Sequence, residues 1–254
     1  MAENDWVFAL KGRIKRNRRL ATLLFYLTDH MYLRNGPRDR FLGRFSPGAR
    51  LLNLGAGFRP SPAGFLPIDR DPLPGIRVVG DTSDVPLRSG ILDGILCETV
   101  LEHVPDAEKA FAELDRLLKP GGRVFLTLPF LWPYHASPHD YRRWTSSGVA
   151  RDLRGFQIVD QGLTGGPTTA LVNLAHEWLA ITLSLGFAPL YRILYLALMP
   201  FLFPFKFLDV VVGRMPNAEK IGALFYVEAV KPAIGAGSAA PADGVGNPAL
   251  RATR

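Results

Sequence analysis

Short apolar segments recur along the chain, separated by turn-forming or helical stretches. Each is four to eight residues long and is bounded by Gly, Pro, Asp or Ser, which is typical of buried strands. We predict strands at 50–54, 65–69, 76–80, 94–97, 123–129, 155–160 and 223–230. Because strands alternate with helical or turn segments, the sheet should be mostly parallel and doubly wound, an α/β fold.

A helix is expected between the fourth and fifth strands. From Asp106 to Leu118 the apolar residues fall on one face, and the Lys119-Pro120-Gly121-Gly122 run ends the helical pattern. A second, shorter helix is expected to begin at Thr145, whose side chain can cap it.

The first fifty residues differ from the rest in charge. They hold 11 Lys or Arg and 4 Asp or Glu, which gives +7 and accounts for the whole net charge of the chain. Residues 10–33 carry apolar side chains at helical spacing, and Gly36-Pro37 is expected to end that helix. The arm is a helix packed on the main domain or an interfacial helix with its basic end on anionic headgroups.

An apolar insertion separates the sixth and seventh strands. Residues 178–205 include one charge, Arg192, and Pro189, Pro200 and Pro204 interrupt them. The two pieces, of 14 and 13 residues, are shorter than the ~20 residues of a membrane span. They suit an interfacial or re-entrant segment or a lid, and the alternative is a helical subdomain packed on the core or used for dimerisation.

These segments divide the chain into five parts. The expected boundaries are a basic helical arm at 1–49, a core at 50–161, the hydrophobic helical insertion at 162–221, the last core strand at 222–232 and a disordered tail at 233–254.

The chemistry-bearing residues lie where strands end. N-L-G-A-G-F at 53–58 follows the first strand, and Gly55 and Gly57 allow backbone to approach a ligand there. Asp69 ends the second strand, and its two oxygens match the two hydroxyls of a ribose. The alternative is a solvated turn aspartate, with Asp71 as the competing residue. Asp84 follows the third strand and could accept from an adenine amino group.

In order, the chain carries N-L-G-A-G, I-D, G-D-x-x-D-V-P-L, V-L-E-H-V and L-L-K-P-G-G-R-V. This series resembles the class I methyltransferase domain, in its methyltransferase type 11-like form. The resemblance covers residues 50–161, with a last strand near 223–231. It implies a Rossmann-like, seven-stranded sheet with S-adenosylmethionine as cofactor. The cofactor-binding residues that it implies are Asn53, Gly55, Ala56, Gly57, Asp69, Asp84, Val85, Cys97 and Glu98.

The sequence departs from that family pattern at three points. Asn53 replaces the usual acidic residue, Arg59 replaces the usual third glycine, and Pro60 and Pro62 leave little room for the usual first helix. The same features disfavour a dinucleotide dehydrogenase, because its fingerprint needs a third glycine and a helix whose N-terminus binds the pyrophosphate.

The segment 129–145, after the fifth strand, suits the methyl acceptor. His135 and His139 are candidate general bases, since neutral imidazole accepts a proton near pH 7. The alternative is a rigid loop that caps the next helix. His135, His139 and Asp140 also suggest a metal, but we expect none, because Pro138 prevents a regular helical ligand face. The candidate acceptor-binding residues are Trp132, Tyr134, Tyr141 and Arg142.

Together these features predict methyl transfer from S-adenosylmethionine to a lipid, lipid-linked glycan or other hydrophobic acceptor at an anionic membrane surface. One alternative is a non-enzymatic membrane-associated binding protein that keeps the fold. The other is a nucleic-acid methyltransferase, which is disfavoured because no N/D-P-P-Y/F motif follows the fourth strand. The single cysteine, Cys97, fits a cytoplasmic protein at the inner face of the membrane. The sequence leaves the oligomeric state open.

Overall fold

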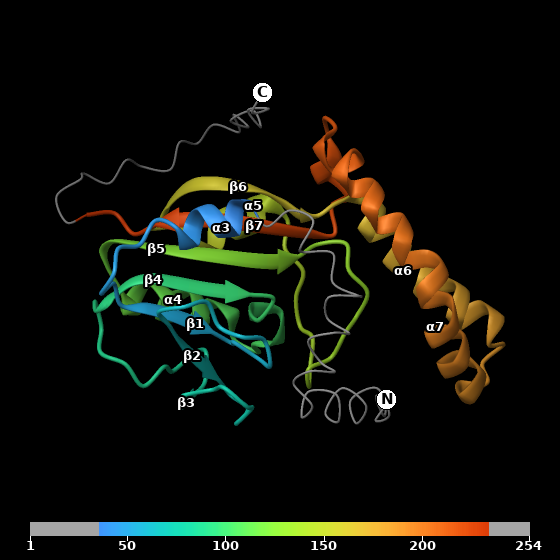
Figure 1. Cartoon of the computed structure of the whole chain (residues 1–254), viewed down its shortest axis with the longest axis horizontal. Helices are drawn as coiled ribbons and strands as arrows, with labels where there is room; N and C mark the ends of the chain where they lie inside the picture. The colour runs from blue at the N-terminus through green and yellow to red at the C-terminus, as the bar shows by residue number, and fades with distance from the viewer. Residues whose placement is uncertain (1–35, 234–254) are drawn as a thin grey trace.

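The computed structural model describes residues 36–233, and its centre is a seven-stranded sheet (Figure 1). The strand order is β3-β2-β1-β4-β5-β7-β6, and β7 runs antiparallel to both of its neighbours. The strands are β1 (Leu51–Leu54), β2 (Phe65–Asp69), β3 (Val78–Val79), β4 (Leu92–Glu98), β5 (Leu118–Pro129), β6 (Gln157–Gly165) and β7 (Leu224–Val230). All seven predicted strands are present, and the α/β, Rossmann-like fold is confirmed.

Helices cover both faces of the sheet. They are α3 (Gly36–Leu42), η2 (Leu101–His103), α4 (Ala107–Leu117), α5 (Ser146–Asp152), α6 (Pro167–Leu183), α7 (Ala188–Leu202), η3 (Phe203–Val210), η4 (Val212–Arg214) and η5 (Ala218–Ile221). The predicted helix between β4 and β5 is α4, and the Asp106 side chain caps it by accepting from the Lys109 amide at 3.0 Å. As expected, α5 begins after Thr145, whose hydroxyl oxygen accepts from the Gly148 amide.

Alternating side chains of the strands build two cores. On one face, Leu52, Ile95 and Leu126 pack with the apolar side of α4 and with α5 in the larger core. On the other face, Leu96 and Phe125 pack against Phe41 of α3. The sheet is therefore buried on both sides, as a parallel sheet requires.

The helix α3 at the start of the described chain has no counterpart among the predicted helices, and Pro37 lies in its first turn. Proline fits a first helical turn because the amide that it lacks has no partner there in any helix. The predicted helix at 10–33 and nearly all of the predicted tail, residues 234–254, lie outside the described residues.

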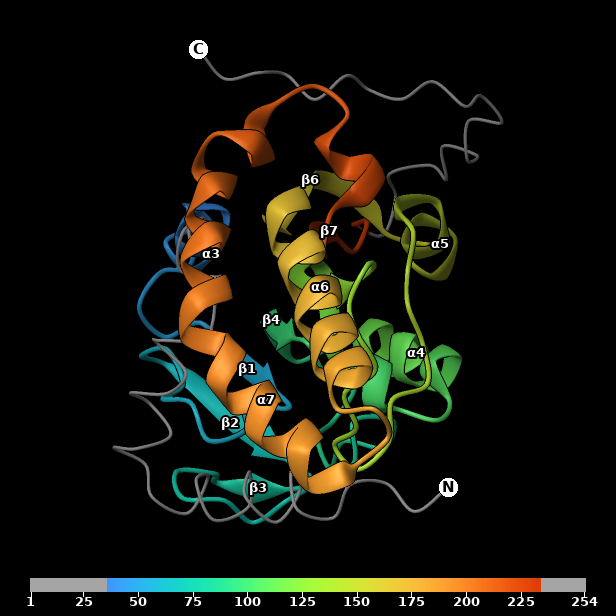
Figure 2. The ribbon, with the colours of Figure 1, turned by 90° about the vertical axis from the view of Figure 1, so that its right-hand side faces the viewer.

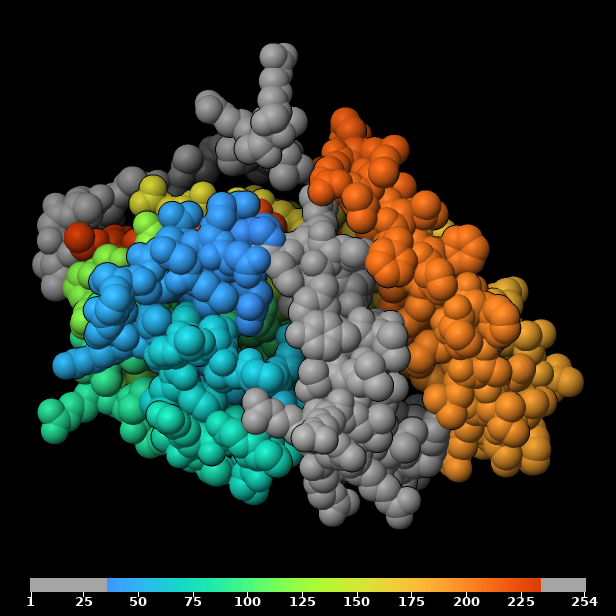
Figure 3. Space-filling view, in the orientation of Figure 1, coloured from blue at the N-terminus to red at the C-terminus, as the bar shows by residue number. Residues whose placement is uncertain are grey.

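The insertion stands apart from the sheet. Figures 1 and 2 show α6 and α7 side by side beyond the carboxyl ends of β4 and β5, and Figure 3 shows the insertion as a separate lobe. None of the α7 residues is buried. The Asp209 carboxylate in η3 ties the lobe together, because it accepts from the Thr168 and Thr169 amides in the first turn of α6, each at 2.8 Å.

Candidate active site

The glycine loop after β1 has the backbone that its sequence predicts. Gly55 (φ +67°) and Gly57 (φ +60°) are both left-handed. A Cβ at Gly55 would lie 2.4 Å from Cγ2 of Val100, so no side chain fits there. A Cβ at Gly57 would meet nothing within 4 Å, so a ligand could approach the backbone at that position.

Asp69 faces this loop from the end of β2. Its Oδ2 accepts from the Gly57 amide at 2.8 Å, and its Oδ1 accepts from the Asp71 amide at 2.9 Å. Each carboxylate oxygen has a second acceptor position, so the pair can still accept two vicinal hydroxyls. The loop and this carboxylate therefore fit the ribose and chain of S-adenosylmethionine. Asp71, the competing residue, is exposed and contributes its backbone amide.

Asn53 acts within the loop. Its side chain is buried, and its Nδ2 donates to the Ser61 hydroxyl at 2.8 Å. This bond spans part of the segment 55–64, which consists of turns and irregular backbone and contains no helix. Asn53, which stands where the family pattern has an acidic residue, thus binds the segment in which the usual first helix is absent.

Three other predicted cofactor-binding residues, Asp84, Val85 and Cys97, differ in how far their side chains are exposed. The Asp84 side chain is exposed after β3, whereas the Val85 side chain is buried in the larger core. The Val85 amide donates to Oε1 of Glu113 at 2.8 Å. Cys97 is also in that core, and burial raises the pKa of its thiol. The structure therefore places the Val85 and Cys97 side chains inside the core instead of at the open edge of the site.

Glu98 ends β4 beside the glycine loop. Nε of Arg38 in α3 lies 3.0 Å from Oε1 of the Glu98 carboxylate, so this ion pair joins α3 to the end of β4. The next residue, Thr99, has a positive φ of 53°, an uncommon backbone for threonine that occurs at functional edges.

The acceptor-side loop after β5 is held by Arg143. Its Nε donates to the Trp132 carbonyl at 3.1 Å, and its Nη2 donates to the Pro133 carbonyl at 3.0 Å and to Asp140 at 2.6 Å. Tyr134 and Tyr141 point to solvent, while Trp132 and Arg142 are half-buried. The loop is rigid at its base and presents aromatic side chains at its tip.

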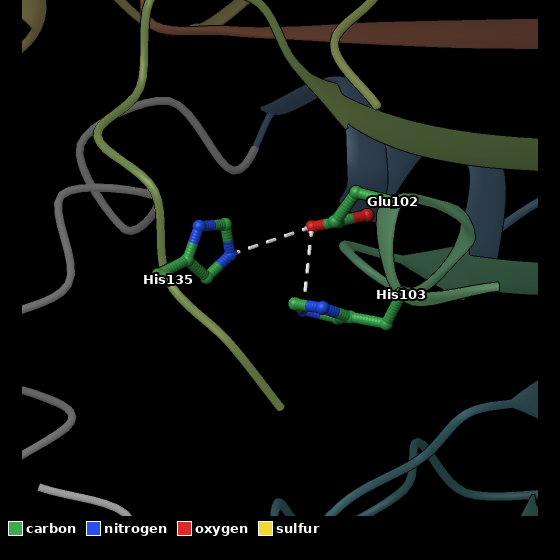
Figure 4. A group of neighbouring side chains, drawn as sticks. All are labelled: Glu102, His103 and His135. Carbon is green, nitrogen blue, oxygen red and sulfur yellow. Dashed lines mark ion pairs between the residues drawn. The ribbon is translucent and has the colours of Figure 1, made fainter. Parts of the chain in front are cut away.

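His135 lies inside this loop and not at its tip. Its Nε2 is 3.7 Å from Oε1 of Glu102, and its Nδ1 is 3.2 Å from Oδ2 of Asp140. His103 approaches the same Glu102 oxygen, with its Nε2 at 3.9 Å (Figure 4). The His139 ring is exposed and contacts Tyr141, so the set of His135, His139 and Asp140 does not converge as ligands. From the sequence His103 was only a minor candidate for the pocket rim and Glu102 was missed, although both follow β4 at the edge where His135 follows β5.

The charged groups of this cluster shift one another's pKa values, and the shift at His135 bears on its role. Burial alone would lower its pKa, but the Asp140 and Glu102 carboxylates more than offset this and raise the pKa to about 9. Burial lowers the pKa of His103, against the Glu102 charge. Against its own burial, the Arg143 guanidinium and His135 hold the pKa of Asp140 well below its usual range. These partners favour the protonated form of His135, which argues against a role as the neutral base that the sequence suggested.

Comparisons with known proteins agree with this architecture. Residues 65–126 match the family described as "Methyltransferase domain". The chain is 29% identical over 108 residues to the ubiquinone biosynthesis O-methyltransferase of Cupriavidus pinatubonensis, covering 35% of this chain and 43% of that protein. It is 45% identical over 40 residues to the enzyme of the same name from Xanthomonas oryzae pv. oryzae, covering 16% of this chain and 17% of that protein. The chain thus spans less than half the length of these relatives.

Among solved structures, the methyltransferase bound to the Trm112 activator of Haloferax volcanii superposes with a TM-score of 0.52 at 15% identity. The match covers 91% of this chain and 99% of that one, and at this identity it bears on the fold alone. Residues 65–126 therefore resemble a methyltransferase domain, and the seven-stranded sheet has the class I methyltransferase fold. S-adenosylmethionine is the cofactor of this family.

Proposed function

We propose that the chain transfers a methyl group from S-adenosylmethionine to a hydrophobic acceptor, a lipid or lipid-linked molecule, at an anionic membrane surface. The observation that carries this proposal is the position of the exposed apolar lobe. It lies beyond the same carboxyl edge of the sheet that holds the glycine loop and Asp69 (Figure 2).

The donor side rests on the residues at that edge. Gly55 and Gly57 face the cofactor chain, and Asp69 accepts from the ribose hydroxyls. Asn53, Ala56 and Glu98 line the same edge, and Asp84 faces the adenine. A role for Val85 or Cys97 would be through the backbone, because both side chains are buried. The bound cofactor supplies an electrophilic methyl group, and the chain contributes orientation and exclusion of water.

The membrane side rests on exposed apolar surface. Residues Ala188–Arg214 form a 27-residue helical stretch that is long and apolar enough to cross a membrane by length and composition alone. Its second half is tied to the rest of the protein by buried Asp209, which binds the first turn of α6, and by buried Lys206, whose ammonium lies 5.9 Å from the ring centre of Trp132. A helix fixed in this way suits a membrane surface better than a span. A soluble monomer rarely leaves so many large apolar side chains in water: Trp178, Ile181, Phe187, Ile193, Leu196, Phe201, Phe205 and Phe207 are each more than half exposed.

Basic charge favours an anionic leaflet as the surface. The excess of seven positive charges falls within the first fifty residues, and each contributes about 1 kcal/mol near such a surface. We therefore place the protein at the cytoplasmic face of the membrane, as a peripheral or monotopic protein.

The acceptor would pass between the lobe and the acceptor-side loop. Lys206 of the lobe lies 5.9 Å from the ring centre of Trp132 in that loop, so the two parts meet there. Trp132, Tyr134, Tyr141 and Arg142 would bind the acceptor. His139, with an exposed ring, is the candidate base if a hydroxyl is methylated, because His135 is charged.

Calorimetry with S-adenosylmethionine and S-adenosylhomocysteine tests the donor side. Asp69→Ala should weaken binding at least about tenfold, because charge-assisted hydrogen bonds are worth about 1.5–3 kcal/mol each before compensation. Asp71→Ala is the matched control, since it removes a neighbouring exposed carboxylate and keeps the amide that binds Asp69. Equal affinity of both variants and the parent would show that the cofactor site is elsewhere.

A further inference from the structure

Glu102 is an unusual buried acid. It is 0% exposed, and neither of its carboxylate oxygens has a hydrogen-bond partner within the described part of the chain. A buried carboxylate without partners is costly unless a cation compensates it. The nearest group that can carry positive charge is the His135 ring, whose Nε2 lies 3.7 Å from Oε1, and a divalent cation bound between them would take over that role.

Two imidazoles converge on that oxygen from different elements. His103 comes from η2 after β4, and His135 comes from the loop after β5 (Figure 4). Their Nε2 atoms lie 3.9 Å and 3.7 Å from Oε1 of Glu102. All three potential ligand atoms lie within 4.8 Å of one another. Ligand atoms about 2.0–2.1 Å from a tetrahedral Zn²⁺ stand roughly 3.4 Å apart, so the two nitrogen–carboxylate separations would shorten by about 0.3–0.5 Å when the ion binds.

The hydrogen bonds of the two rings direct both Nε2 atoms toward Glu102, and a bound metal ion would displace the Nε2 proton of His135. His103 Nδ1 lies 2.6 Å from the His139 carbonyl oxygen, which can only accept, so Nδ1 carries the proton. His135 Nδ1 faces the Pro133 carbonyl and the Asp140 carboxylate, each at 3.2 Å, and must also donate. Metal-binding histidines use this arrangement, because a second acceptor fixes the ring and directs the other nitrogen toward the metal.

We propose that Glu102, His103 and His135 bind one divalent transition-metal ion such as Zn²⁺. Two imidazoles and one carboxylate form a common ligand set for such ions and leave at least one coordination position for water or an oxygen of another molecule. Both rings are partly exposed, so the site can be reached from solvent. This set differs from the one that the sequence suggested, because it replaces His139 and Asp140 by Glu102 and His103.

Calorimetric titration of the full chain with ZnCl₂, after dialysis against a chelator, tests the site. The parent should bind one Zn²⁺ per chain. Glu102→Gln and His135→Gln should each weaken binding at least about 100-fold, since even outer-shell changes cost 10- to 100-fold. His139→Asn is the matched control, because its exposed ring is outside the site while its backbone carbonyl still binds His103. It should bind Zn²⁺ like the parent.

Binding of S-adenosylhomocysteine by each variant serves as the folding control and does not depend on the metal. A parent that binds no Zn²⁺ would overturn the proposal and leave an internal pair of the His135 imidazolium with Glu102. Parent-like Zn²⁺ binding by Glu102→Gln would also overturn it, because the ion would then lie elsewhere. A chain that binds Zn²⁺ but not S-adenosylhomocysteine would instead contradict the proposed function and leave the metal site standing.

Discussion

Truncating the exposed apolar side chains of α7 should release the protein from membranes without unfolding it. Phe201 is 73% exposed and Ile193 is 63% exposed, so neither supports a core. Burying a large apolar side chain is worth about 1.5–3 kcal/mol, which these exposed fractions reduce to roughly 1–2 kcal/mol for each residue. The double variant Ile193→Ser, Phe201→Ser should therefore bind vesicles about 30- to 1,000-fold more weakly, at 1.4 kcal/mol per tenfold.

Flotation with liposomes that contain anionic phospholipid measures this effect. Val79→Ser is the matched control, because Val79 is 57% exposed but belongs to the edge strand β3 and not to the lobe. The control should float like the parent, and all three proteins should unfold at similar urea concentrations. If the double variant also floats like the parent, the apolar face of α7 does not contact lipid, and a second protein chain would be the better occupant.

Three further outcomes follow from the same structure. Asp209→Ala removes the cap of α6 and should lower the free energy of unfolding by about 0.5–2 kcal/mol, seen as a lower urea midpoint; an unchanged midpoint would contradict the cap. His139→Ala should reduce turnover about 100- to 10,000-fold at unchanged cofactor affinity if its ring takes the acceptor proton, and unchanged turnover would leave the loop a structural part only. The last variant neutralises the basic run formed by Arg13, Lys15, Arg16, Arg18 and Arg19. It should bind anionic vesicles more weakly but neutral detergent as well as the parent does, and an equal loss of binding to both would refute the electrostatic role.

The strands and the glycine loop could be predicted because their signals are local. Buried parallel strands appear as short apolar runs, and a glycine at a strand end marks a backbone that side chains cannot adopt. At Gly55 the reason is visible, because Val100 occupies the space of a Cβ. The short helix α3 was not predicted, because Gly36-Pro37 suggested the end of an earlier helix and Pro also fits the first turn of a new one.

Side-chain direction and long-range pairing could not be predicted in the same way. Cys97 and Val85 match family positions, yet their side chains face the core, and only the sheet pairing decides that. Glu102, His103 and His135 come together because β4 and β5 are neighbours that end at the same edge. The raised pKa of His135 depends on Asp140 and Glu102, which only the folded chain brings to it, so the sequence alone suggested a neutral base.

The most direct measurement is methyl transfer itself. The purified chain is incubated with S-adenosylmethionine labelled in its methyl group and with a lipid extract of bacterial membranes, and the organic phase is then counted. The account expects label in the organic phase with the parent and none with Gly55→Val, because a side chain at Gly55 would overlap Val100 and disrupt the cofactor loop. Label that stays in the aqueous phase with the parent, or equal labelling by the variant, would contradict the account.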